Sequence, residues 1–203
     1  MQTIHDATAA LEAAWPEIVT QSREVLGSEL FYQALVYHCL RSHGKVPIGQ
    51  LGMNVKMRIS NPVSPLFQKL DSKKHKDYQG AFEPIPDVCL FSPDVNADWR
   101  RRSREKTLSS LLLAIEIKAS ERDKGRLRIG EIKTDIEKLA AHHEEARAQG
   151  YSFLPVVMVI DTAPDENERM TSQSLKTAQG LAAELAVGFM YLSPKNEIRN
   201  LTV

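Results

Sequence analysis

The sequence predicts a single α/β domain in which helices flank a mixed β-sheet. Two nearly continuous apolar runs, LLLAIEIK at 111–118 and LPVVMVID at 154–161, have the composition of strands that are buried on both faces. Between them, apolar residues recur at three-to-four spacing in 129–150, which predicts an amphipathic helix. A strand, a helix and a second strand in this order form a βαβ unit with parallel strands and a right-handed crossover.

The length and composition fit one domain with appended helices. With 203 residues, we expect an N-terminal helical extension at 1–27, a core at 28–192 and a C-terminal strand or hairpin at 193–203. Lysine and arginine total 26 and balance 26 aspartates and glutamates, so a nucleic-acid partner would need local basic patches. The two cysteines, Cys39 and Cys89, lack CxxC spacing and are expected to be core thiols. Without a run of about twenty apolar residues, the chain is expected to be soluble, cytoplasmic and without a membrane partner.

The N-terminal third is expected to be helical. Thr3 and Asp6 resemble a capping box, and Pro16 suits the first turn of a helix. Residues 3–26 therefore predict either two short helices or one helix kinked at the proline. Ser28 is the expected N-cap of the next helix, which opens the core.

The middle of the chain predicts strands separated by polar connections. The alternation in MNVKMRIS at 53–60 indicates a strand with one solvated face, and 69–80 is polar and irregular. A short buried strand is expected to begin near Asp87, before a long connection to the strand at 111–118. The remaining expected elements are a helix at 172–186, a strand in FMYL at 189–192 and the terminal hairpin.

Two charged side chains near the end of an apolar strand are the main candidates for chemistry. Because side chains alternate between the faces of a strand, Glu116 and Lys118 share a face. Ionised groups in this setting lose hydration, which is tolerated only if they pair, bind metal or serve chemistry. By the same alternation, one face is expected to hold Leu111, Leu113, Ile115 and Ile117, and the other Leu112, Ala114, Glu116 and Lys118.

A second carboxylate is expected at the same edge of the sheet. The pattern acid-x-Lys occurs three times, but only Glu116-Ile-Lys118 lies on a buried strand. Pro86-Asp87 heads another apolar strand, and pairing of the two strands would bring Asp87 and Glu116 together. A divalent cation relieves the repulsion between two such carboxylates, and Mg²⁺ fits best because it binds a few carboxylates, waters and phosphate oxygens. Mn²⁺ is expected to substitute for it, and Lys118 is placed to orient water and hold a phosphate oxygen.

The segment PIPDVCLF followed by LLLAIEIK resembles the bipartite motif of the PD-(D/E)xK nuclease superfamily, which has the restriction-endonuclease-like fold. The resemblance covers about 28–192 and implies an αβββαβ core, but it identifies no subfamily. It implies that Asp87, Glu116 and the Ile117 carbonyl are metal ligands. It also implies that Lys118 positions or activates water.

Further residues match supporting positions of that family. Glu29 matches the acid that many members contribute from the first helix. The helix after the motif corresponds to a region where members place supporting polar residues, which here are Lys133, Asp135 and Lys138.

The activity implied by the resemblance is that of a Mg²⁺-dependent endonuclease, with DNA as the expected substrate. A homodimer or a place in a larger complex is compatible with it. One alternative is a catalytically silent nuclease-fold module that binds nucleic acid or a protein partner. Another is a metal-dependent hydrolase of small phosphate compounds.

Basic residues near both halves of the motif predict phosphate contacts, because lysine and arginine supply most non-specific affinity for nucleic acid. Trp99 either stacks on a base or pins its loop to the body of the protein. The residues expected to bind nucleic acid are Arg100, Arg101, Arg102, Arg104, Arg126, Arg128 and Lys133.

Each candidate also has a structural interpretation. Glu116 and Lys118 could form an ordinary ion-pairing pattern, Asp87 could cap a turn, and Glu29 could complement the helix dipole. The adjacent histidines His142 and His143 have no ligand partner at helical spacing and are expected to be structural. A solvated helix face is the structural interpretation for Glu131, Lys133, Asp135 and Lys138.

Overall fold

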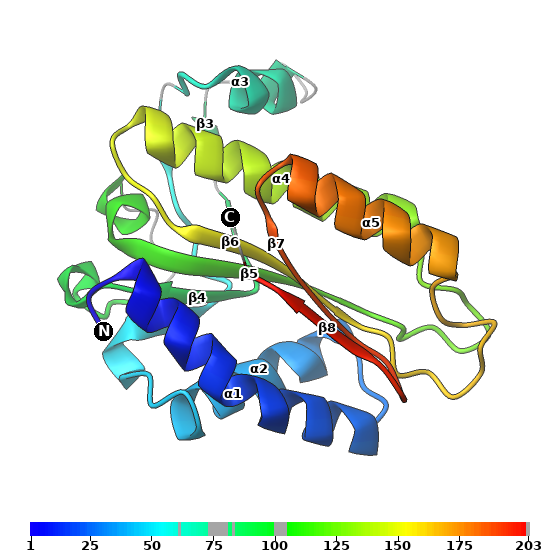
Figure 1. The fold of residues 1–203 in the computed structure, drawn as a ribbon. Helices are drawn as coiled ribbons and strands as arrows, with labels where there is room; N and C mark the ends of the chain where they lie inside the picture. Colours follow the sequence, from blue (N-terminus) through cyan, green and yellow to red (C-terminus); the bar gives the residue numbers. More distant parts are fainter. Residues whose placement is uncertain (61, 73–80, 83, 100–104, 202–203) are drawn as a thin grey trace.

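The computed structural model is an α/β fold with a six-stranded mixed sheet between two helical layers (Figure 1). It describes residues 1–60, 62–72, 81–82, 84–99 and 105–201. The strand order is β1-β4-β5-β6-β7-β8. The bounds are Leu51–Met53 for β1, Val88–Phe91 for β4, Leu111–Ala119 for β5, Leu154–Ile160 for β6, Gly188–Leu192 for β7 and Glu197–Asn200 for β8.

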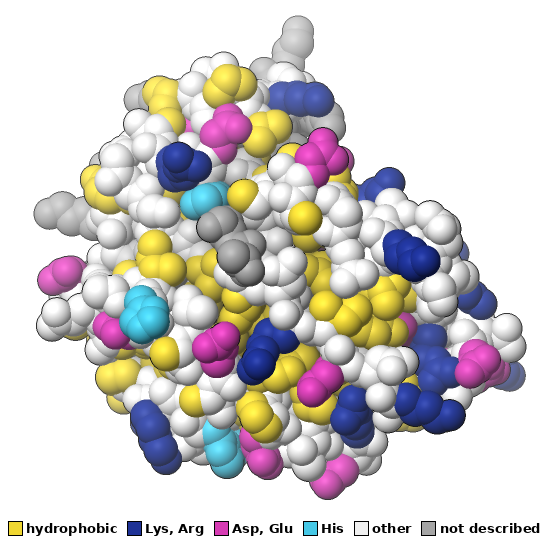
Figure 2. Space-filling model, viewed as in Figure 1, with side chains coloured by type: hydrophobic (Ala, Val, Ile, Leu, Met, Phe, Trp, Pro, Cys, Tyr) yellow, Lys and Arg dark blue, Asp and Glu magenta, His cyan; other side chains and the backbone are white. Residues whose placement is uncertain are grey.

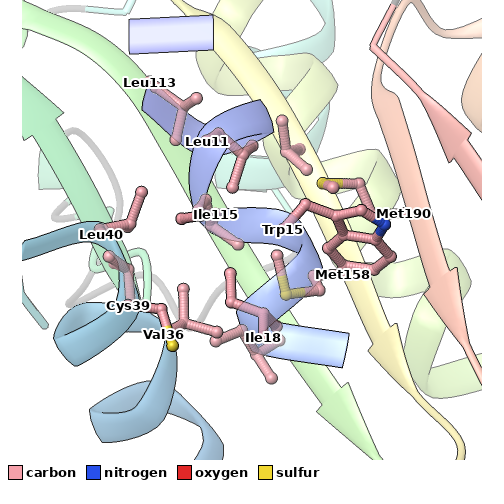
Figure 3. Close-up of a cluster of buried hydrophobic side chains, with 14 of the residues drawn as sticks. Leu11, Trp15, Ile18, Val36, Cys39, Leu40, Leu113, Ile115, Met158 and Met190 are labelled. Atoms are coloured by element: carbon pink, nitrogen blue, oxygen red, sulfur yellow. The ribbon is translucent and has the colours of Figure 1, made fainter. Parts of the chain in front are cut away.

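The helices α1 (Ile4–Glu24) and α2 (Glu29–Ser42) cover one face of the sheet. Figure 3 shows Leu11, Trp15 and Ile18 of α1 packed toward Ile115 of β5. The opposite face is covered by α4 (Ile129–Ala148) and α5 (Ser172–Glu184). Both faces of the central strands are therefore buried, which explains why β5 and β6 are apolar along almost their whole length.

The sequence correctly predicted the central βαβ unit. Strands β5 and β6 pair in parallel, and α4 connects them. Strand β4 pairs antiparallel with β5, with Val88 opposite Ile115, and β1 pairs antiparallel with β4. The described part of the C-terminal segment contributes one strand, β8, which pairs antiparallel with β7 and not within the segment itself. Along the chain, these elements follow the order α2, β1, β4, β5, α4 and β6, with residues 54–87 inserted between β1 and β4.

The helix boundaries follow local signals. Thr3 and Asp6 form the expected capping box at the start of α1, and the Ser28 side chain accepts a hydrogen bond from the Phe31 amide at the start of α2. The alternative of two short N-terminal helices was wrong, because α1 continues through Pro16 as one helix. Helix α4 stops before Gly150, whose φ of 85° is a conformation that glycine adopts without strain.

The prediction of one strand at 53–60 was wrong. Strand β1 ends at Met53 because Asn54 has a φ of 51°, a left-handed conformation that breaks the extended chain. Ile59–Ser60 (β2) instead pairs with Ala81–Phe82 (β3) in a separate two-stranded sheet. The stretch 69–80 is not irregular throughout, since its first residues complete the helix α3 (Pro65–Ser72).

The expected alternation along β5 also failed at its first two residues. Phe91 lies opposite Leu111 although Leu90 lies opposite Leu113, so Leu112 is an extra residue in the ladder. As a consequence, Leu112 packs on the α1 and α2 side with Leu113, and Leu111 packs on the α4 and α5 side with Ala114. The alternation expected for the rest of the strand, which carries the candidate site, is preserved.

Within the described part of the chain, no helix combines the length and apolar character needed to cross a membrane.

Candidate active site

Asp87 immediately precedes β4 and lies beside Glu116 of β5, the strand that pairs with β4. Val88 pairs with Ile115, so the residues one step further along each strand are Asp87 and Glu116. The Ile117 amide also donates a hydrogen bond to Asp87 Oδ2 at 2.7 Å. The strand pairing expected from the sequence thus brings both motif halves together. Interpretation of Asp87 as a simple turn cap does not fit, because its carboxylate is bonded to β5 and α2.

Neither acid ionises as readily as it does in water. Burial raises the pKa of Asp87 to about 6, against the opposing effects of the Ile117 amide and the Lys118 ammonium. Burial also raises the pKa of Glu116 to about 8, and the charges of Asp87 and Asp135 add to this effect. Two neighbouring carboxylates repel each other when both are ionised, and a bound divalent cation relieves this repulsion.

Lys118 binds two acids from the flanking helices rather than Glu116. Its ammonium lies 3.1 Å from Glu29 Oε2 of α2 and 3.0 Å from Asp135 Oδ2 of α4. It also donates to the Ile117 carbonyl at 3.3 Å. The described ion pairs of Lys118 lead to residues of two helices, so they do not form the ordinary cross-strand pattern that was the structural interpretation.

Lys118 remains a cation throughout the neutral pH range. Burial would by itself lower the pKa of its ammonium, but the charges of Asp135 and Glu29 outweigh burial and raise the pKa well above its ordinary value. A permanently protonated amine cannot accept a proton from water. The arrangement favours a role in orienting water and holding a phosphate oxygen, and disfavours activation of water by proton removal.

Glu29 is directed into the site from the start of α2. It is the first residue of that helix, and its backbone amide donates to Glu121 Oε2 at 2.7 Å. Its side chain reaches Lys118, so it does more than complement the helix dipole.

Sequence reasoning missed the buried role of Asp135. The side chain of Asp135 is only 6% exposed and contacts both Lys118 and Lys138, so the solvated-face interpretation was wrong for this residue. Its position gave a readable signal, because Asp135 falls on the apolar line of α4 formed by Ile132, Ile136 and Leu139. A charge on a buried helix line requires a partner, and that partner is Lys118.

The residues present fit a divalent cation. The N–H and C=O of one strand residue point toward the same neighbouring strand, so the Ile117 carbonyl faces the side of β5 on which Asp87 lies. The donor set is thus two carboxylates and one carbonyl, all of them oxygens as Mg²⁺ prefers. No group of three acidic, histidine or cysteine side chains in metal-binding geometry occurs among the described residues. Mg²⁺ completes its coordination with waters, so two carboxylates suffice.

Three of the basic residues predicted to bind nucleic acid lie in the described part of the chain: Arg126, Arg128 and Lys133. Arg126 and Arg128 are exposed in the loop after β5, and Lys133 is half-buried on α4. In Figure 2, several Lys and Arg side chains gather where the loops after β5 and β6 lie in Figure 1. Arg122 is paired with Glu131 at 2.8 Å. The predicted contacts of Arg100, Arg101, Arg102 and Arg104 fall outside the described residues.

Trp99, His142 and His143 have structural surroundings. The ring of Trp99 packs on Phe91 with a centroid distance of 5.2 Å, which favours the role of pinning its loop. His143 is buried and meets the ring of Phe153 edge-on at 5.4 Å, and its neighbour His142 is also buried. Both histidines lie within the packed α4 layer.

Comparison of the chain with protein-family models, with curated proteins and with solved structures gives no match, so the site is interpreted from its own residues.

Proposed function

We propose that this protein is a Mg²⁺-dependent endonuclease of the PD-(D/E)xK type that hydrolyses phosphodiester bonds in DNA. The observation that carries the proposal is the pairing of β4 with β5, which sets Asp87 beside Glu116 and near Lys118. Asp87 precedes these two residues by about thirty positions in the sequence. The order α2, β1, β4, β5, α4 and β6 corresponds to the αβββαβ core that the motif resemblance implies, which supports the same proposal.

The roles of the residues follow from their surroundings. Asp87, Glu116 and the Ile117 carbonyl are the groups that would hold the cation. A bound Mg²⁺ would lower the pKa of a water molecule and neutralise charge that builds on the phosphate. Lys118 presents a fixed positive charge beside these ligands, where it can orient the attacking water and hold a non-bridging phosphate oxygen. Glu29 and Asp135 keep that ammonium in place.

Phosphate groups further along the strand would be bound by exposed basic residues. Arg126 and Arg128 are exposed in the connection between β5 and α4, the two elements that supply Lys118 and Asp135. Such contacts are independent of base sequence and position the backbone at the site.

A catalytically silent module is the second candidate, and one observation favours it. Both oxygens of Asp87 already accept hydrogen bonds, and Lys118 is held by two acids, so these groups also have a structural role. A module of this kind would bind nucleic acid through its basic residues without cutting it.

The proposal predicts metal-dependent cleavage of supercoiled plasmid by the purified protein. Nicking should appear with Mg²⁺ or Mn²⁺, disappear with a chelator, and be lost in Asp87→Asn because that change removes an anionic ligand. The measurement is the fraction of nicked plasmid over time. Asp94→Asn is the matched control, since Asp94 is an exposed aspartate in a separate turn.

Cleavage that is equal in wild type and Asp87→Asn would contradict the assigned site. Salt-sensitive DNA binding without cleavage under any metal would favour the silent module. If the protein cleaves RNA and not DNA, the assigned site would stand and the proposed substrate would change from DNA to RNA.

A further inference from the structure

The carboxylate of Asp87 is bonded on both sides. Gln33 Nε2 of α2 donates to Asp87 Oδ1 at 2.7 Å, and the Ile117 amide of β5 donates to Asp87 Oδ2 at 2.7 Å. The two donors come from a helix and from the neighbouring strand, so together they fix the plane of the carboxylate. Each oxygen has a second lone pair that stays available for another partner.

Gln33 is itself oriented by Asn54. Asn54 Nδ2 donates to Gln33 Oε1 at 3.2 Å, and the Asn54 backbone amide donates to the carbonyl of Asp87 at 3.1 Å. An amide side chain has its acceptor and its donors on opposite sides. Because Asn54 occupies the Oε1 side, the Nε2 group of Gln33 must face Asp87. The flipped amide would set two acceptors against each other at hydrogen-bond distance.

The burial of Gln33 and the backbone conformation of Asn54 both support a specific role for this pair. Gln33 is buried, with 8% of its surface exposed, and a buried amide requires partners for both of its ends. Asn54 has the left-handed φ of 51° that ends β1 and turns its side chain toward α2. Gln33 lies one helical turn after Glu29, so α2 supplies one residue to Lys118 and another to Asp87.

We propose that Gln33, oriented by Asn54, is a positioning residue that holds the Asp87 carboxylate in the orientation in which it binds a divalent cation. This inference rests on the proposed function, because it requires Asp87 to be a metal ligand. Groups that orient metal ligands through hydrogen bonds change metal affinity by about 10- to 100-fold when they are removed.

The test is the dissociation constant of Mn²⁺, measured by isothermal titration on metal-free protein without any nucleic acid. Gln33→Met keeps a side chain of similar length and removes both hydrogen bonds, so we expect Mn²⁺ affinity to fall by about 10- to 100-fold. Asn54→Gly retains a residue that tolerates the left-handed backbone and removes only the amide. We expect it to weaken Mn²⁺ binding in the same direction and by less.

The double variant distinguishes positioning from general destabilisation. If Asn54 acts through Gln33, Gln33→Met combined with Asn54→Gly should bind Mn²⁺ about as tightly as Gln33→Met alone. The matched control is Gln21→Met, because Gln21 makes the same kind of hydrogen bond to a carboxylate, that of Glu17, on α1. Its Mn²⁺ affinity should equal that of wild type.

Unchanged Mn²⁺ affinity in Gln33→Met, with Mn²⁺ still bound by wild type, would overturn this inference and leave the proposed function standing. Absence of Mn²⁺ binding in wild type would overturn both. If Gln33→Met does not fold, Asn54→Gly decides the matter, since affinity equal to wild type in that folded variant would refute the positioning role.

Discussion

Replacing Lys118 by methionine is expected to slow plasmid cleavage by roughly 10²- to 10³-fold, while Mn²⁺ and DNA still bind. The substitution keeps most of the apolar stem and removes the charge that we propose orients water and holds phosphate. The proposed cation ligands Asp87 and Glu116 are untouched, so the loss should appear in kcat and not in the affinity for DNA. Single-turnover cleavage rates and Mn²⁺ titration measure the two effects separately.

Lys138→Met is the matched control for this prediction. Lys138 contacts Asp135 at 3.1 Å, as Lys118 does at 3.0 Å, but its side chain is 44% exposed and it makes no described contact with Ile117 or Glu29. Both variants deprive Asp135 of one cation and remove a positive charge that acts on Glu116. Only Lys118→Met removes the ammonium that contacts the Ile117 carbonyl and Glu29. Equal cleavage losses in the two variants would mean that the effect arises from the unpaired Asp135 carboxylate, which would contradict the catalytic role of Lys118.

Replacing Glu116 by glutamine is expected to abolish the stabilisation that Mn²⁺ gives to the folded protein. A neutral amide is a weak ligand for a divalent cation, and the same substitution removes a charge that is costly to bury. The variant should therefore gain stability without metal and lose the response to metal. Melting temperatures with and without Mn²⁺, recorded across a range of pH, measure both effects.

The direction of the pH dependence follows from the raised pKa of Glu116. The ordinary value is 4.5, and the value in the metal-free folded protein is about 8. The folded state thus binds the proton more tightly than the unfolded state, so this contribution to stability is present below pH 4.5 and is lost as pH rises through 8. Asp87 has the same sign between 3.8 and about 6. The metal-free Glu116→Gln variant should melt above wild type at pH 8 to 9 and close to it at pH 4.

The affinity for Mn²⁺ should increase with pH, whereas the stability of the metal-free protein should decrease. The cation competes with the proton on Glu116, so wild-type affinity should rise by about tenfold per pH unit between about pH 6, above which Asp87 is ionised, and about pH 8. The glutamine variant should lack this contribution. Retention of wild-type Mn²⁺ affinity and of its pH slope in Glu116→Gln would show that Glu116 is not a ligand.

The catalytic candidates could be predicted from the sequence because strands impose a period of two. That period places Glu116 and Lys118 on one face, and the apolar run after Asp87 indicates a strand that can pair with theirs. Gln33 and Asn54 carry no such signal, because their roles depend on how α2 packs over β1 and β4. Asp135 lies between these cases, since its place on an apolar helix line was visible although its partner was not.

The errors in the fold have local physical causes. The strand predicted at 53–60 does not form as one element, because the left-handed residue Asn54 ends β1 and only Ile59–Ser60 forms a further strand, β2. The side assignments of Leu111 and Leu112 failed because an extra residue enters the β5 ladder, and alternation cannot predict a bulge. Both irregularities depend on neighbouring strands, whereas the apolar runs of β5 and β6 signal their burial directly.

Anomalous diffraction from a crystal soaked in Mn²⁺ tests the central claim most directly. We expect a peak between Asp87 and Glu116, with carboxylate oxygens of both residues at about 2.2 Å, near the distance expected for Mg²⁺. The Ile117 carbonyl should face the same peak. A well-diffracting soaked crystal with no peak between these carboxylates, or with Mn²⁺ bound elsewhere only, would contradict the account.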